Sequence, residues 1–120
     1  MKREPKMEEK NKYGFVSGGW IFDYMDRKAL YAMNCAVRET RDKNFYTASA
    51  KIKFLNQLCD IKDITLNIGV FVKDKHHIVV IISMWKVHGE IIAKAEFLFV
   101  EAKQNKCEIK GSKNGQTKLA

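Results

Sequence analysis

Residues 17–26 read SGGWIFDYMD, and this stretch decides the fold because it opens the longest helical pattern in the chain. A glycine pair stands at its start, and two carboxylates, Asp23 and Asp26, interrupt a run that is otherwise apolar. From residue 20 to about residue 37, apolar side chains point in nearly every direction of a helix. In a protein without membrane spans, such a helix is one that other elements enclose.

The helix carries a single polar stripe. At 100° per residue, four polar residues fall within an arc of about 100° on one side of the helix. These residues are Asp23, Asp26, Arg27 and Asn34. We expect them to mark the side of the helix that does chemistry or meets solvent.

After residue 44 the apolar pattern changes from a helical period to a period of two, which is typical of strands with one buried face. This pattern predicts strands over residues 45–57, 64–72 and 90–102. Residues 77–87 are continuously apolar, as expected of a strand that is covered on both sides or used in a subunit contact. The side of the first strand expected to be buried carries Ala48, Ala50, Ile52 and Phe54.

The short polar connections at residues 73–76 and 88–90 have the length of hairpin loops, and Gly89 is available for a positive φ. One buried helix followed by four antiparallel strands predicts an α+β fold in which a curved sheet wraps around the helix. A sheet of four or five strands leaves its edges exposed, so we expect pairing with a second copy as a homodimer, with a tetramer as the next alternative.

Length and composition bound the rest. The chain has 120 residues, 46% of them hydrophobic, which fits a single domain. Its longest apolar run is far shorter than the roughly 20 residues of a membrane span, and residues 1–10 lack the apolar segment of a secretory signal, so we expect a cytoplasmic protein.

Three cysteines at unrelated spacings argue against disulfides and zinc, and we interpret them as reduced packing residues. They are Cys35, Cys59 and Cys107.

The formal charge of +8 suggests an anionic partner. About half of the excess lies in a polar tail, residues 103–120, where five lysines face one glutamate. Residues 118–120, which a cloning vector can supply, are left out of the fold argument. No basic helix or zinc-finger spacing supports nucleic acid, and a basic surface equally favours a small polyphosphate ligand such as coenzyme A. Residues 1–13 are expected to form a loose arm or a short edge strand, and residues 14–102 the domain.

Together, these features resemble the hotdog-fold acyl-CoA thioesterase superfamily, over about residues 14–102. In that family a glycine pair opens the central helix and an aspartate follows seven residues after the second glycine, a spacing that Gly19 and Asp26 reproduce. The segment YAMN, residues 31–34, is similar to the phenylacetyl-CoA thioesterase branch, and residues 51–63 resemble the family's next strand and turn.

The resemblance implies hydrolysis of an acyl-CoA thioester at a dimer interface, with no metal and no cofactor beyond the coenzyme A of the substrate. Asp26 would be the general base or nucleophile, and the backbone at Gly18 and Gly19 would polarise the carbonyl at the helix N-terminus. Ser17, Asn34 and Asn56 would contact substrate or water.

Each role has a simpler alternative. Asp26 can be a helix-dipole or ion-paired residue, as we expect for Asp23, and Asn34 can be a buried hydrogen-bonding residue. Ser17 stands where the family usually has His or Asn, and Asn56 begins a pair that replaces Arg-Pro. These departures favour a second hypothesis, a hotdog protein that binds acyl-CoA or another acyl ligand without turnover. The three histidines, His76, His77 and His88, are interpreted as loop residues, and the two tryptophans as core or interface residues.

Overall fold

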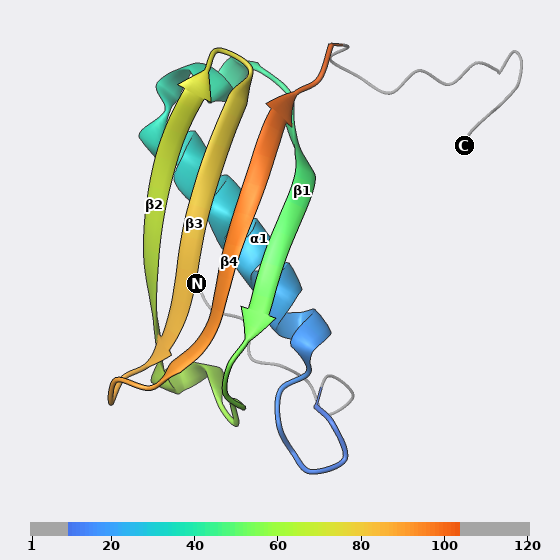
Figure 1. Ribbon diagram of the computed structural model, residues 1–120, viewed down its shortest axis with the longest axis vertical. Coiled ribbons are helices and arrows are strands. Elements are labelled where there is room, and N and C mark those ends of the chain that lie inside the picture. The colour runs from blue at the N-terminus through green and yellow to red at the C-terminus, as the bar shows by residue number, and fades with distance from the viewer. Residues whose placement is uncertain (1–9, 104–120) are drawn as a thin grey trace, which may run out of the picture.

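A computed structural model describes residues 10–103 of the chain. One long helix lies across one face of a curved four-stranded antiparallel sheet (Figure 1), which confirms the predicted α+β hotdog fold. The two ends expected to form an arm and a basic tail lie largely outside the described residues, as does Cys107. The elements are α1 (Gly18–Ala36), η2 (Arg38–Asp42), β1 (Phe45–Phe54), η3 (Ile61–Asp63), β2 (Ile64–Asp74), β3 (His77–Lys86) and β4 (Ile91–Glu101).

The helix α1 begins at a side-chain cap. Ser17 is the N-cap residue, and its Oγ accepts a hydrogen bond from the N–H of Trp20 at 3.2 Å. Six side chains of α1 are buried against the sheet: Trp20, Ile21, Tyr24, Met25, Ala29 and Met33. The helix ends where the N–H of Val37 bonds to the carbonyl of Met33 and the chain turns into η2.

The strand order in the sheet is β1-β4-β3-β2. The last three strands form the two predicted hairpins, and Gly89 has a φ of 96° in the second turn. The first strand, β1, does not pair with β2. It lies at the opposite edge of the sheet, beside β4. Among the described residues, β1 and β2 are therefore the two edges of the sheet.

The core lies between α1 and the inner face of the sheet. In the central strand β3, Ile78, Val80, Ile82 and Met84 are all at most 2% exposed, whereas Ile81 between them is 48% exposed. The prediction that the chain covers this strand on both sides is wrong for the described residues. Its alternative, that the strand takes part in a subunit contact, stays a prediction.

The first strand contains a bulge that changes its predicted face. The register with β4 shifts between Thr47 and Ser49, so Ala48 is an extra residue and is exposed. Thr47 therefore takes the place on the inner face that alternation assigned to Ala48, opposite the buried Phe99.

Two smaller predictions, on the cysteines and on Trp20, have opposite outcomes. Cys35 and Cys59 are free but exposed, so the interpretation of them as packing residues is wrong. Trp20 is 6% exposed and belongs to the core, as predicted. Within residues 10–103, no helix has the length and apolar character needed to cross a membrane, and no cluster of three or more potential metal ligands is found.

Candidate active site

The N-terminus of α1 offers two backbone donors in different surroundings. The N–H groups of Gly18 and Gly19 lie in the first turn, where an α-helix supplies no acceptor. A Cβ on Gly18 would meet the Phe54 ring, with Cζ at 3.3 Å, so the ring packs directly against this glycine. At Gly19, no described atom lies within 4 Å of the corresponding position. The backbone of α1 is therefore walled by an aromatic ring at Gly18 and open at Gly19.

The side chain of Asp26 is held from the neighbouring strand. Thr47 of β1 donates a hydrogen bond from Oγ1 to the carboxylate Oδ1 of Asp26 at 2.9 Å. The two residues are 21 positions apart in the sequence, and the bulge in β1 brings the hydroxyl to the helix. Asp26 is partly buried, so its carboxylate is both oriented and accessible.

Asp26 shares a helix face with Gly19. Seven residues turn the helix by about 700°, which returns to within about 20° of the same direction, and raise it by about 10 Å. A carboxylate on a helix also leans toward the N-terminus. The remaining gap is wide enough for a carbonyl group and a water molecule between the N–H groups and the carboxylate.

Asp23 has a different environment from Asp26. Its Oδ2 lies 3.0 Å from Nε of Arg27 one turn later, and both side chains are more than half exposed. Such a surface pair contributes little to stability. The predicted polar stripe of the helix therefore contains two different environments. Asp23 and Arg27 form an ion pair in solvent, whereas Asp26 is hydrogen-bonded to Thr47 of the sheet.

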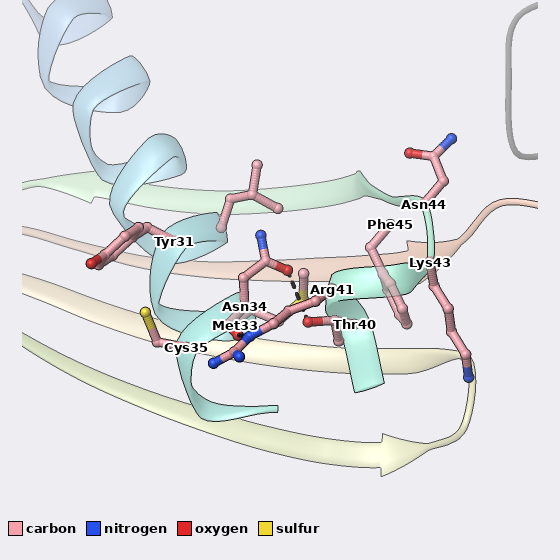
Figure 2. A pocket seen from close by; sticks show the side chains of 10 residues that line it. Tyr31, Met33, Asn34, Cys35, Thr40, Arg41, Lys43, Asn44 and Phe45 are labelled. Carbon is pink, nitrogen blue, oxygen red and sulfur yellow. Dashed lines mark hydrogen bonds between the residues drawn. The ribbon is translucent and has the colours of Figure 1, made fainter. Parts of the chain in front are cut away.

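Asn34 lies two turns beyond Asp26, in a hollow of about 560 Å³ at the other end of α1 (Figure 2). The side-chain Oδ1 of Asn34 accepts a hydrogen bond from Oγ1 of the buried Thr40 at 2.8 Å. The backbone carbonyl oxygen of Asn34 accepts a hydrogen bond from Nε of Arg41 at 3.1 Å. Tyr31 stands at the mouth of the hollow, and a hydrogen bond with Cys35 raises the pKa of its phenol. Asn34 therefore ties α1 to η2, as well as lining this hollow.

The other two predicted substrate contacts are engaged in the fold. Ser17 caps α1, as described above. Nδ2 of Asn56 donates to the carbonyl of Ile91 at 2.6 Å, which fastens the chain just after β1 to the start of β4. This anchor keeps the end of β1, and with it Phe54, beside the start of the helix.

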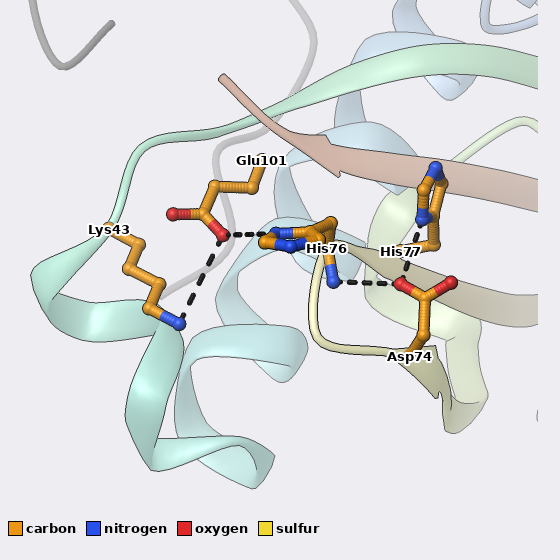
Figure 3. A network of polar contacts seen from close by, with 5 residues as sticks. All are labelled: Lys43, Asp74, His76, His77 and Glu101. Atoms are coloured by element: carbon orange, nitrogen blue, oxygen red, sulfur yellow. Dashed lines mark hydrogen bonds and ion pairs between the residues drawn. The ribbon is translucent and has the colours of Figure 1, made fainter. Parts of the chain in front are cut away.

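A second polar cluster occupies the far end of the sheet, away from the glycine pair (Figure 3). Nδ1 of His77 lies 2.8 Å from Asp74, and Nδ1 of His76 lies 2.9 Å from Glu101, which also faces Lys43 at 4.0 Å. The hydrogen bond from His77, helped by the N–H of His76, lowers the pKa of Asp74. These contacts tie the β2–β3 turn to the end of β4, and the histidines belong to a turn and a strand end, close to the loop predicted for them.

The sequence matches a known family. A family model described as the thioesterase superfamily matches residues 13–93, more than half of the chain. The chain belongs to the thioesterase superfamily. No curated protein matches the sequence.

Several solved structures superpose on the chain at low identity. A hypothetical thioesterase from Streptococcus pneumoniae with coenzyme A is 18% identical, with a TM-score of 0.63, over 87% of this chain and 77% of that one. The smu.793 protein of Streptococcus mutans bound to acetyl CoA is 20% identical, with a TM-score of 0.64, over 87% and 80%. The BH2602 protein of Bacillus halodurans with CoA is 16% identical, with a TM-score of 0.68, over 82% and 67%. At these identities the likeness establishes the fold.

Within this thioesterase fold, the predicted site residues separate into two groups. Gly18, Gly19 and Asp26 lie along one stretch of α1 that faces β1, whereas Ser17, Asn34 and Asn56 hold elements together at either end. Sequence reasoning missed Thr47 and Phe54, which supply the hydrogen bond to Asp26 and the wall at Gly18. Phe54 was visible only as a strand residue, and no local pattern signals that a bulge turns Thr47 inward.

Proposed function

We propose that this protein is a cytoplasmic acyl-CoA thioesterase that acts as a homodimer, with Asp26 as the reacting carboxylate. One observation carries the proposal: Asp26, held by Thr47, lies on the same helix face as Gly19 in the first turn of α1, where the space that a Cβ would occupy is open. Membership of the thioesterase superfamily supports the reaction class, and similar structures that contain coenzyme A or acetyl CoA support the ligand class.

The chemistry follows from the two ends of this arrangement. The helix N-terminus carries partial positive charge, and its free N–H groups stabilise the oxyanion that forms when a thioester carbonyl is attacked. The carboxylate of Asp26 takes a proton from water as general base, and the backbone rise of about 10 Å from Gly19 to Asp26, less the lean of the carboxylate, leaves room for that water. Thr47 donates to one carboxylate oxygen, which leaves the other oxygen to accept the proton from the attacking water.

The dimer is proposed from the free edge of the sheet. In the described chain β1 pairs only with β4, so its other side presents unpaired backbone groups. Large apolar side chains are exposed along this edge and on the adjoining face of α1: Leu30, Tyr31, Tyr46, Phe54 and Leu55. A second copy that pairs β1 with β1 would satisfy the edge and lie beside the side of α1 that carries Asp26.

The test is release of free thiol from short, long and aromatic acyl-CoA thioesters, with matched variants of the two helix carboxylates. We expect Asp26→Asn to lower kcat by a factor of about 100 or more, as loss of a general base does. Asp23→Asn serves as the control, because Asp23 is on the same helix but paired with Arg27 in solvent. Full activity of Asp26→Asn at matched folding would refute the assignment.

A second candidate is a hotdog protein that binds an acyl-CoA or another acyl ligand without turnover. The observation that favours it is the structural use of Ser17 and Asn56, whose side chains cap α1 and anchor the end of β1. Saturable acyl-CoA binding by the wild-type protein, with no thiol released from any thioester in the panel, would establish this function in place of hydrolysis.

A further inference from the structure

The outer face of the sheet, which α1 does not cover, carries a group of lysines beside the β1 edge. Lys51 and Lys53 of β1 and Lys94 of β4 line an open hollow there, together with Glu96 and the half-exposed Ile81. All three lysines are exposed. With three ammonium groups against one carboxylate, this basic hollow has a clear excess of positive charge.

The basic hollow contains an arrangement that costs stability. Lys53 and Lys94 are direct partners in the β1–β4 register, and like charges placed directly opposite in antiparallel strands destabilise the sheet. In the part of the chain that the structure describes, none of the three lysines forms an ion pair with a carboxylate, not even with Glu96, the register partner of Lys51. The fold therefore leaves their charge uncompensated, as expected of a site that receives an anion.

The basic hollow lies next to the proposed reaction site, on the opposite face of the same strand end. The ring of Phe54 packs against Gly18 on the inner face, and Lys53, the residue before it, belongs to the outer face. Figure 1 shows the end of β1 beside the first turn of α1. An extended ligand that passes around this strand end would reach both the helix N-terminus and the lysines.

We propose that the basic hollow binds the phosphate groups of coenzyme A while the thioester lies at the start of α1. The inference rests on the proposed function, because an acyl-CoA is the ligand that joins a thioester to phosphates. Lysine ammonium groups bind phosphate as point charges. The exposed side chain of Ile81 adds apolar surface beside them for the nucleotide.

The experiment is calorimetric titration of the full-length protein with coenzyme A, 3′-dephospho-coenzyme A and pantetheine. For Lys53→Gln/Lys94→Gln we expect the Kd for coenzyme A to rise about tenfold or more, with a smaller rise for the dephospho form and none for pantetheine. Lys73→Gln is the matched control, since Lys73 is an exposed lysine of β2, the far edge strand. The double variant should also show a higher Tm than wild type, because the like-charge pair is removed.

Three results would overturn the inference: no binding of coenzyme A by wild type, an unchanged Kd in the more stable double variant, or tighter lysine-dependent binding of a single-stranded RNA that displaces coenzyme A. The proposed function is judged separately. Lysine-dependent coenzyme A binding without thiol release supports the basic hollow and refutes the hydrolase. Thiol release with KM and Kd unchanged in the double variant supports the hydrolase and refutes the basic hollow.

Discussion

The two faces of the sheet are built from the same strands but differ in the exposure of their side chains. On the inner face, side chains from β3 and β4 pack against α1 with almost no exposure. On the outer face, described residues leave apolar side chains such as Ile81 and Phe71 about half exposed, and Ile81 lies next to uncompensated lysines. The contrast shows that the inner face is specified by burial, whereas the outer face is free to carry charge.

Two consecutive isoleucines allow the sharpest test of this contrast. Ile82 is fully buried on the inner face, and Ile81 is 48% exposed on the outer face. We expect Ile82→Ala to lower the free energy of unfolding by about 2–5 kcal/mol, because it removes buried methyl groups and leaves a cavity. Ile81→Ala should cost less than about 1 kcal/mol. Urea denaturation measures both, and equal losses would mean that the outer face is covered in solution, as in a subunit contact.

The two sides of the bulge in β1 give the next comparison. Thr47 faces the helix and hydrogen-bonds to Asp26, whereas Ser49 lies just beyond the bulge on the outer face. We expect Thr47→Val to lower kcat about tenfold, about 1.4 kcal/mol in activation free energy, because the carboxylate loses its orienting donor. Ser49→Ala should change kcat less than twofold. Steady-state kinetics decides, and equal effects of the two substitutions would argue against a role for Thr47.

Two glycines, one at each face, each contact a phenylalanine ring. A Cβ on Gly18 would lie 3.3 Å from Phe54, and one on Gly69 would lie 3.0 Å from Phe71. Both rings are about half exposed and can shift, so we expect either alanine substitution to change the free energy of unfolding by less than about 1 kcal/mol. Only Gly18→Ala should reduce thioester turnover, since it displaces the wall beside the reaction site. Comparable losses of turnover in both variants would remove that distinction.

The smallest effect is expected at the β2–β3 turn, where Asp74 accepts hydrogen bonds from His77 and His76. These bonds lower the pKa of Asp74 below its ordinary value of 3.8. The stability they provide is therefore present above pH 3.8 and is lost as the pH falls through the lower, folded-state value. Asp74→Asn should unfold at slightly lower urea concentration than wild type at pH 6, and the difference should disappear well below pH 3.8. A difference that persists in acid would point to another cause.

The local periodicity of the sequence was sufficient to predict most of the fold. The enclosed helix, the strand positions and the two hairpins followed from apolar patterns and turn residues, because these reflect burial by neighbours close in sequence. The place of β1 beside β4 did not follow, since it depends on pairing between segments about 50 residues apart. Continuous apolar sequence in β3 also could not reveal that one side of the strand stays open.

For the site, the motif spacing located Gly19 and Asp26, but not their surroundings. The helical period alone placed both on one face. The roles of Ser17 and Asn56 in holding α1 and the end of β1 depend on contacts across the fold, and so does the hydrogen bond from Thr47. The exposure of Cys35 and Cys59 shows the same limit, since residue type alone suggested burial.

Because the bulge at Ala48 adds one residue to β1, the face to which each later side chain points depends on this extra residue. Before it, odd-numbered residues face the helix, and after it even-numbered ones do. Deletion of Ala48 itself would restore regular alternation and leave Thr47 and Phe54 both facing α1, whereas one further residue inserted between them without a second bulge would turn one of the two side chains to the outer face. A one-residue insertion in β1 is therefore expected to be more harmful than deletion of Ala48, and alignments of related chains should allow a gap at this position.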